Sequence, residues 1–251
     1  MFDEIGTPPE LQDVIDDCYE AFASYRPPRW LDAPPYRDPA AILATLSSAP
    51  LRQLTSDQLG PYASWAMTTV GGEDDYKHFL PRILELAIGD QSHPGIDPPA
   101  IAGKLRYGGW PTWSVEERAA VQAVFAGAWR YALKQHPDDY DPERWLNGIA
   151  LIDSDLDAAL AAWLSSPSPN ATLQLAEFFR GTAERLFSDR ANRDFWQGAG
   201  DEAIETMRRW LPSEPVVDRL LSAGGTVGSG DEWRIDQALL ALNALSPARP
   251  R

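Results

Sequence analysis

Cysteine is nearly absent from this sequence, with Cys18 as its single representative among 251 residues. One cysteine cannot form a disulfide within the chain, which is typical of proteins in a reducing compartment. No run approaches the ~18 apolar residues of a membrane span, and the first residues lack the basic and apolar regions of a secretory signal. We therefore expect a cytoplasmic protein without a membrane partner.

Basic residues are also scarce. Lysine and arginine number 22 against 37 acidic residues, which gives a net charge of −15 at pH 7. Such a surface repels the phosphate backbone, and no basic cluster counteracts it, so we expect no nucleic-acid partner. A basic protein partner would be attracted instead, although acidity can also serve solubility alone.

Signals for β-strands are missing as well. No alternating run of β-branched residues has a useful length, and no turn signal joins two such runs. Amphipathic helical spacing recurs along the whole chain. The sequence therefore predicts an all-α protein of about ten to twelve helices, arranged as an irregular α/α array or a helical bundle. We expect one domain over residues 1–251.

Helix starts are marked by local sequence. Ser114 and Glu117 form a capping box before the longest expected helix, 115–135. On the first expected helix, Cys18 lies on the apolar stripe and is expected to be buried. Further start signals, in which a capping residue precedes proline, lie at Thr7-Pro8, Asp38-Pro39, Asp97-Pro98 and Asp141-Pro142.

A proline-rich segment, residues 26–37, breaks this helical pattern. Proline disfavours the helix interior and favours extended backbone. We expect an extended segment that crosses the body of the protein and is pinned by Trp30 and Tyr36.

Sequence motifs of common catalytic sites are missing. The chain has no phosphate-binding loop, no dinucleotide-binding glycine pattern, no HExxH and no GxSxG. Cysteine and histidine are too few for a structural zinc site, so we expect neither a metal nor a cofactor. His93 and His136 each precede a proline, and we expect both to be exposed.

One distinctive block crowds acids before a histidine. Glu73, Asp74 and Asp75 precede His78, which lies three and four residues beyond the two aspartates. On a helix these groups share a face, so a carboxylate could orient the imidazole for acid–base chemistry, or the set could hold a divalent metal. Alternatively, the acids simply favour the positive end of the helix dipole.

Pro81 leaves two possibilities for the backbone of this block. Either a helix starts near Glu73 and contains Pro81, or the helix proper starts at Leu80-Pro81 after a turn. The run from Asp75 to Leu86, DYKHFLPRILEL, resembles a segment in a group of bacterial α-helical proteins of uncharacterised function. The resemblance covers about 20 residues; it implies a bacterial origin and no activity.

Three functions are compatible with these features. The first is a protein-binding module, most concretely an immunity protein that neutralises a basic toxin by stoichiometric binding. The second is a helical scaffold or adaptor in a larger assembly. The third is an enzyme built on the acid–histidine cluster, which the missing motifs make the less favoured reading.

Aromatic residues between helices complete the candidate site. Trp110 and Trp113 fall between expected helices, where aromatic side chains have a better chance of exposure, although the favoured alternative is that they plug the ends of neighbouring helices. The candidate binding residues are Trp30, Tyr36, Glu73, Asp74, Asp75, His78, Trp110 and Trp113.

Overall fold

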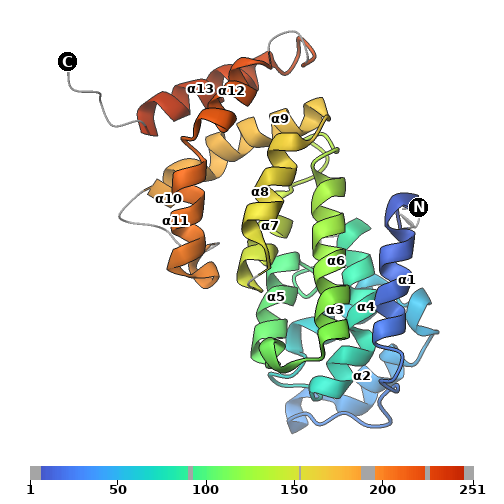
Figure 1. The fold of residues 1–251 in the computed structure, drawn as a ribbon. Helices are drawn as coiled ribbons and strands as arrows, with labels where there is room; N and C mark the ends of the chain where they lie inside the picture. The colour runs from blue at the N-terminus through green and yellow to red at the C-terminus, as the bar shows by residue number, and fades with distance from the viewer. Residues whose placement is uncertain (1–6, 90–92, 153, 188–195, 224–226, 246–251) are drawn as a thin grey trace. The chain divides into compact units, whose positions relative to one another are not determined.

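A computed structural model describes residues 7–89, 93–152, 154–187, 196–223 and 227–245 (Figure 1). Within these ranges the chain forms thirteen α-helices and no strand, which confirms an all-α protein. The helices fall into two compact units, residues 1–128 and 129–251. A single domain stays a prediction, because this grouping does not say whether either unit folds alone.

The first unit contains helices whose starts follow the local signals of the sequence. Thr55 and Gln58 form a capping box at the start of α3, and Asp38 accepts a hydrogen bond from the Ala41 amide at the start of α2. The helices are α1 (Gln12–Ala21), α2 (Pro39–Leu46), α3 (Ser56–Trp65), α4 (Glu73–Gly89), α5 (Pro98–Tyr107) and α6 (Val115–Ala132).

Two expectations about helix starts have different outcomes. The Ser114–Glu117 capping box is confirmed, because each residue's side chain accepts a hydrogen bond from the other's backbone amide. A cap at Thr7 is wrong, since its hydroxyl donates to Glu85 across the unit at 2.7 Å. A hydroxyl used in a tertiary hydrogen bond cannot be recognised from its own sequence neighbourhood.

α4 settles the question about Pro81. The helix runs through this residue without ending, so Pro81 lies inside it and is buried. Its N–H is missing, so one backbone hydrogen bond is lost there. Burial of Phe79, Leu80 and Ile83 around it favours the continuous helix.

The second unit begins within α6 and contains the remaining helices. A π-helical turn, Phe179–Ala183, continues α9 into the short helix α10. The helices are α7 (Glu143–Leu151), α8 (Leu156–Ser165), α9 (Pro169–Phe178), α10 (Glu184–Phe187), α11 (Gly200–Trp210), α12 (Glu214–Leu221) and α13 (Glu232–Leu245). In Figure 1, α13 lies alongside α9.

Buried tryptophans fill the core of the second unit. The rings of Trp129 and Trp163 meet edge to face at 5.0 Å, and Trp163 stacks on Trp210 at 5.4 Å. The indole N–H groups of Trp129 and Trp163 donate to the carbonyl oxygens of Ala159 and Ala171. Trp129 and Trp163 are therefore core residues with satisfied polar atoms.

Two smaller expectations concern Cys18 and the membrane. Cys18 is buried and free, as expected, and burial raises the pKa of its thiol to about 12. Among the described residues, every helix is too short or too polar to cross a membrane.

Candidate functional site

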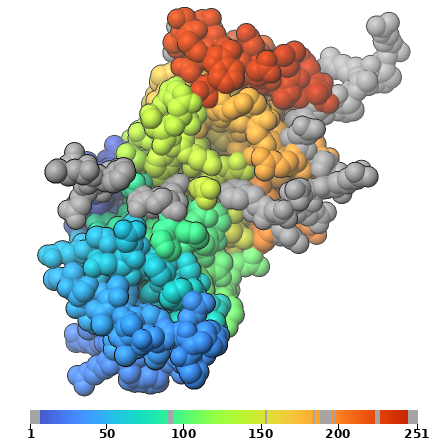
Figure 2. Space-filling model, turned by 180° about the vertical axis from the view of Figure 1, so that it is seen from behind, coloured from blue at the N-terminus to red at the C-terminus, as the bar shows by residue number. Residues whose placement is uncertain are grey.

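An open groove in the first unit brings together part of the predicted site. Its volume is about 870 Å³. The proline-rich segment forms one wall, and the turn that leads into α4 forms the other. It is lined by Arg26, Pro27, Pro28, Arg29, Trp30, Asp32, Gly71, Gly72, Glu73, Asp74 and Asp75. In Figure 2 the blue surface of the residues that follow α1 adjoins the lighter blue and cyan surface of the residues that lead to α4.

Leu31 and Gly71 hold the two walls together. Leu31 is buried, and the Gly71 amide donates a 2.7 Å hydrogen bond to the Asp32 carbonyl. Gly71 has a φ of +66°, and a Cβ there would lie 2.8 Å from a carboxylate oxygen of Asp75. Only glycine combines this backbone conformation with such a close approach.

Trp30 and Tyr36 are exposed, so the expectation that they pin the proline-rich segment is wrong. Their exposed fractions are 71% and 76%. Leu31, between them in sequence, anchors the segment instead. Trp30 lines the groove, whereas Tyr36 does not.

The three acids at the start of α4 have different environments. Asp75 accepts a 2.8 Å hydrogen bond from the Gly72 amide, and Glu73 pairs with Lys77 at 3.0 Å. Asp74 is exposed, and no ion pair joins it to another described residue. Two of the acids therefore organise the turn and the first helical turn, which the helix dipole also favours.

His78 does not form the acid–histidine pair that the sequence allowed. Its Nδ1 lies 3.0 Å from the Tyr25 carbonyl oxygen, and no hydrogen bond joins it to Asp74 or Asp75 within the described residues. Burial lowers the pKa of this imidazole, against the smaller opposing effects of the Tyr25 carbonyl and Asp75. His78 is therefore a half-buried residue that does not line the groove.

Lys77 lies at the centre of a buried polar network next to the groove. Its Nζ is 3.2 Å from Glu117 and 3.1 Å from the Tyr25 hydroxyl, which itself donates to Glu117. Burial alone would lower the pKa of Lys77, but its hydrogen bonds to Glu73, Tyr25 and Glu117 raise it. The network joins Tyr25, which precedes the proline-rich segment, to α4 and α6.

Trp110 and Trp113 are buried, so the expectation of exposure is wrong for both. Each is only 4% exposed, and their rings pack edge to face at 5.5 Å. Trp113 donates from its indole to the Gly108 carbonyl and places its ring 4.2 Å from the Lys77 ammonium. They plug the junction between α5 and α6, which was the alternative expectation.

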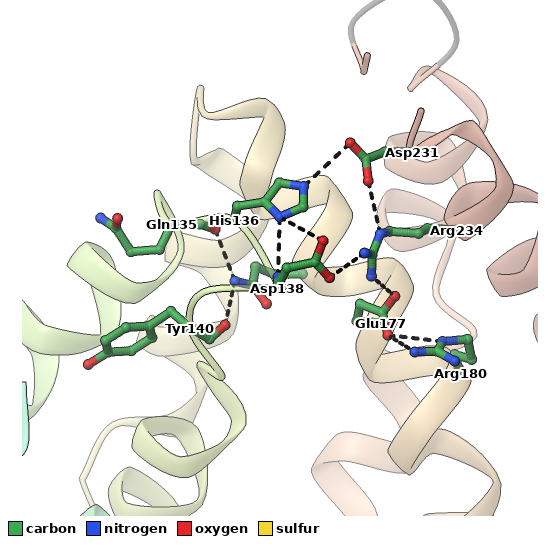
Figure 3. Close-up of polar contacts among 9 residues, drawn as sticks. Gln135, His136, Asp138, Tyr140, Glu177, Arg180, Asp231 and Arg234 are labelled. Carbon is green, nitrogen blue, oxygen red and sulfur yellow. Dashed lines mark hydrogen bonds and ion pairs between the residues drawn. The ribbon is translucent and has the colours of Figure 1, made fainter. Parts of the chain in front are cut away.

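A second polar cluster, in the second unit, could not be expected from the sequence. Arg234 on α13 is 7% exposed, and its guanidinium pairs with Asp138, Glu177 and Asp231 (Figure 3). Burial alone would raise the pKa of Asp231, but the hydrogen bonds that Arg234 and His136 donate to this carboxylate lower it. Asp231 is a local partner three residues before Arg234, but Asp138 and Glu177 come from distant parts of the chain, so no local spacing indicates the whole cluster.

His136 belongs to this cluster, so its expected exposure is wrong. Its Nε2 lies 3.4 Å from Asp231, and its side chain is 29% exposed. Gln174 holds the same loop by donating hydrogen bonds to the Gln135 and Tyr140 carbonyl oxygens. Within the described parts of the chain, no three histidine, cysteine, aspartate or glutamate residues are placed to bind a metal.

Comparison with known proteins gives no relative. No protein-family model, no curated protein and no solved structure matches this chain. Function is therefore inferred from the geometry of the groove and from the charge of the chain.

Proposed function

We propose that this chain is a protein-binding module, most concretely a cytoplasmic immunity protein that neutralises a basic toxin by stoichiometric binding. The groove carries this proposal, because it gathers an exposed indole and several acids from distant parts of the sequence. Tryptophan is enriched among the residues that dominate binding energy at protein interfaces.

The charge of the chain supports a basic partner. Asp32, Glu73, Asp74 and Asp75 line the groove with only two arginines, and the net charge of the whole chain is −15. Such a field steers a basic protein towards the surface and raises its association rate at low salt.

The alternatives have less support. An acid–base enzyme has less support, because the His78 imidazole contacts a backbone carbonyl and Asp75 accepts a hydrogen bond within the turn. A scaffold could use the same groove, but a scaffold is expected to bind several partners at the same time. Stoichiometric binding of one basic partner separates neutralisation from scaffolding.

A tagged pull-down from the native organism, washed at low and high salt and analysed by mass spectrometry, tests the proposal. We expect one stoichiometric basic partner, weakened by high salt, that is lost with Trp30→Ala. Tyr107→Ala is the matched control, because Tyr107 is also an exposed aromatic residue, at 64%, but lies outside the groove. Absence of a partner at both salt concentrations would contradict the proposal.

A further inference from the structure

Both walls of the groove carry carboxylates, and only the proline-rich wall carries arginines. Arg26 and Arg29 belong to the proline-rich wall, whereas Asp74 belongs to the α4 wall. Asp32 adds a further carboxylate. No ion pair joins any of these four side chains to another described residue, and all four are exposed. A ligand with cationic side chains would therefore meet an available carboxylate on each wall of the groove.

The main chain of the proline-rich wall is largely unpaired. Between Arg26 and Ala33, the one main-chain hydrogen bond among described residues is that from Gly71 to Asp32. Pro27 and Pro28 lack an N–H, and no main-chain hydrogen bond among the described residues uses their carbonyl groups or the N–H groups of Arg29 and Trp30. Unpaired main-chain groups along a groove are a general means of holding an extended peptide.

We propose that the groove binds an extended, cationic peptide segment of its partner. The main chain of the segment hydrogen-bonds to the proline-rich wall, and its lysine or arginine side chains face Asp32 and Asp74. Trp30 packs against the apolar parts of the same segment. This inference rests on the proposed function and specifies the form in which the partner presents its charge.

Selection of random linear peptides displayed on phage against the full-length chain tests this proposal. We expect the selected peptides to contain lysine or arginine. Their synthetic copies should bind the double variant Asp32→Asn/Asp74→Asn about ten-fold more weakly, which corresponds to the loss of one charged hydrogen bond. Copies N-methylated at alternate residues keep every side chain and charge but lose main-chain donors, and should weaken by a similar factor.

Two controls make the result specific to the groove. Asp201→Asn/Glu202→Gln removes the same charge from the exposed first turn of another helix, α11, and should leave binding unchanged. Arg26→Ala/Arg29→Ala removes two cations from the groove and should tighten the binding of cationic peptides. Equal weakening by the α11 variant, binding that tolerates N-methylation, or failure to select any cationic peptide would each overturn the inference.

The pull-down distinguishes this inference from the function on which it rests. If Trp30→Ala abolishes capture of a native basic partner but no cationic peptide is selected, the binding function stands and the extended segment is wrong. If peptides bind as expected but the native organism supplies no partner, the chemistry of the groove stands and the proposed function fails.

Discussion

Gly71 fixes the shape of the groove through its backbone conformation. A Cβ at this residue would combine a positive φ with contacts of 2.8 Å to Asp75 and 3.3 Å to Leu31. We predict that Gly71→Ala lowers the free energy of unfolding by about 2 kcal/mol. Urea unfolding measures this change, and crosslinking of the captured partner shows whether the groove is still formed.

Gly103 provides the matched control for that substitution. It lies in α5 with an ordinary φ, and a Cβ there would meet no atom within 4 Å. Gly103→Ala should raise the free energy of unfolding by about 0.5–1 kcal/mol, since alanine is the better helix former. Equal effects of the two substitutions would show that Gly71 has no special role.

Lys77 and Glu117 are a second pair of residues with a large expected effect. Both side chains are 7% exposed and lie 3.2 Å apart. We predict that Lys77→Met lowers the free energy of unfolding by about 3 kcal/mol, because Glu117 remains buried without its cation. The double variant Lys77→Met/Glu117→Leu should recover part of the loss.

A surface ion pair gives the reference for this measurement. Arg208 and Glu205 are 2.7 Å apart but 29% and 60% exposed. Arg208 also donates to the Leu186 carbonyl, so the pair is removed from its exposed side. Glu205→Gln should cost no more than about 1 kcal/mol in the same urea titration. If Lys77→Met lowers the free energy of unfolding by as little, the buried network of Lys77, Tyr25 and Glu117 does not stabilise the α4 wall.

His78 should make the stability of the protein depend on pH. Its pKa is lowered in the folded state by burial, so the unfolded chain binds a proton more readily. Stability that is present above the ordinary imidazole pKa of about 6.5 is then lost as the pH falls below it. Urea unfolding of the wild type and of His78→Gln is measured from about pH 8 to about pH 5. The free energy of unfolding of the wild type should fall relative to that of the variant as the solution becomes acidic. A difference in free energy of unfolding that does not change with pH would show that titration of the His78 imidazole does not affect stability.

At the scale of elements, helix starts with local chemistry could be predicted. Ser114 with Glu117, and Asp38 before Pro39, satisfy the first amides of α6 and α2 with side chains a few residues away. Thr7 fails because its hydroxyl bonds to Glu85, far along the chain. Local capping is visible in sequence, whereas a competing tertiary partner is not.

The candidate site was predictable to a similar extent. Trp30 and the acids at 73–75 can each be recognised in the sequence, but their meeting depends on the burial of Leu31 and the turn at Gly71. The loop sequence around Trp110 and Trp113 would suit an exposed aromatic pair as well as a buried one. Their burial against the Lys77 network results from packing between α4, α5 and α6, which has no signal in a single sequence.

α13 is held by one buried arginine, and this gives a prediction for the element as a whole. Arg234 pairs with three carboxylates, of which Asp138 and Glu177 belong to other elements. We predict that Arg234→Met lowers the local stability of α13 by about 2 kcal/mol, because the carboxylates are left partly buried without a cation. Hydrogen exchange at the Ile235 and Ala238 amides measures this loss.

Arg209→Met on α11 is the control for that experiment. Arg209 is exposed and makes long hydrogen bonds, of 3.3 and 3.4 Å, to residues of its own helix. Its removal should leave exchange in α13 unchanged. Unchanged exchange in both variants would mean that apolar contacts of Ile235 and Ala238 alone hold the helix.

At the scale of the whole molecule, α6 is shared by the two units. The boundary follows Ala128, so Val124 and Phe125 are buried residues of the first unit and Trp129 is one of the second. Of the 18 residues of α6, 115–128 belong to the first unit and 129–132 to the second. Unfolding of the first unit would leave this last turn without the rest of its helix, and a single helical turn is unstable in water. We therefore predict that the chain unfolds as one cooperative domain.

Cys18 and the buried tryptophans allow this prediction to be tested without truncating the chain. Burial raises the pKa of Cys18 to about 12, so its thiol should not react near neutral pH until the first unit opens. Trp30, Trp65, Trp110 and Trp113 lie in the first unit, so the measurement uses a variant in which these four are phenylalanine. The remaining fluorescence, which includes the buried Trp129, Trp145 and Trp163, then reports on the second unit. A Cys18→Ala control identifies the thiol signal. The midpoints of thiol labelling and tryptophan fluorescence in urea should coincide, since coincident probes are the mark of a two-state transition. Separated midpoints would show that the two units unfold as independent domains.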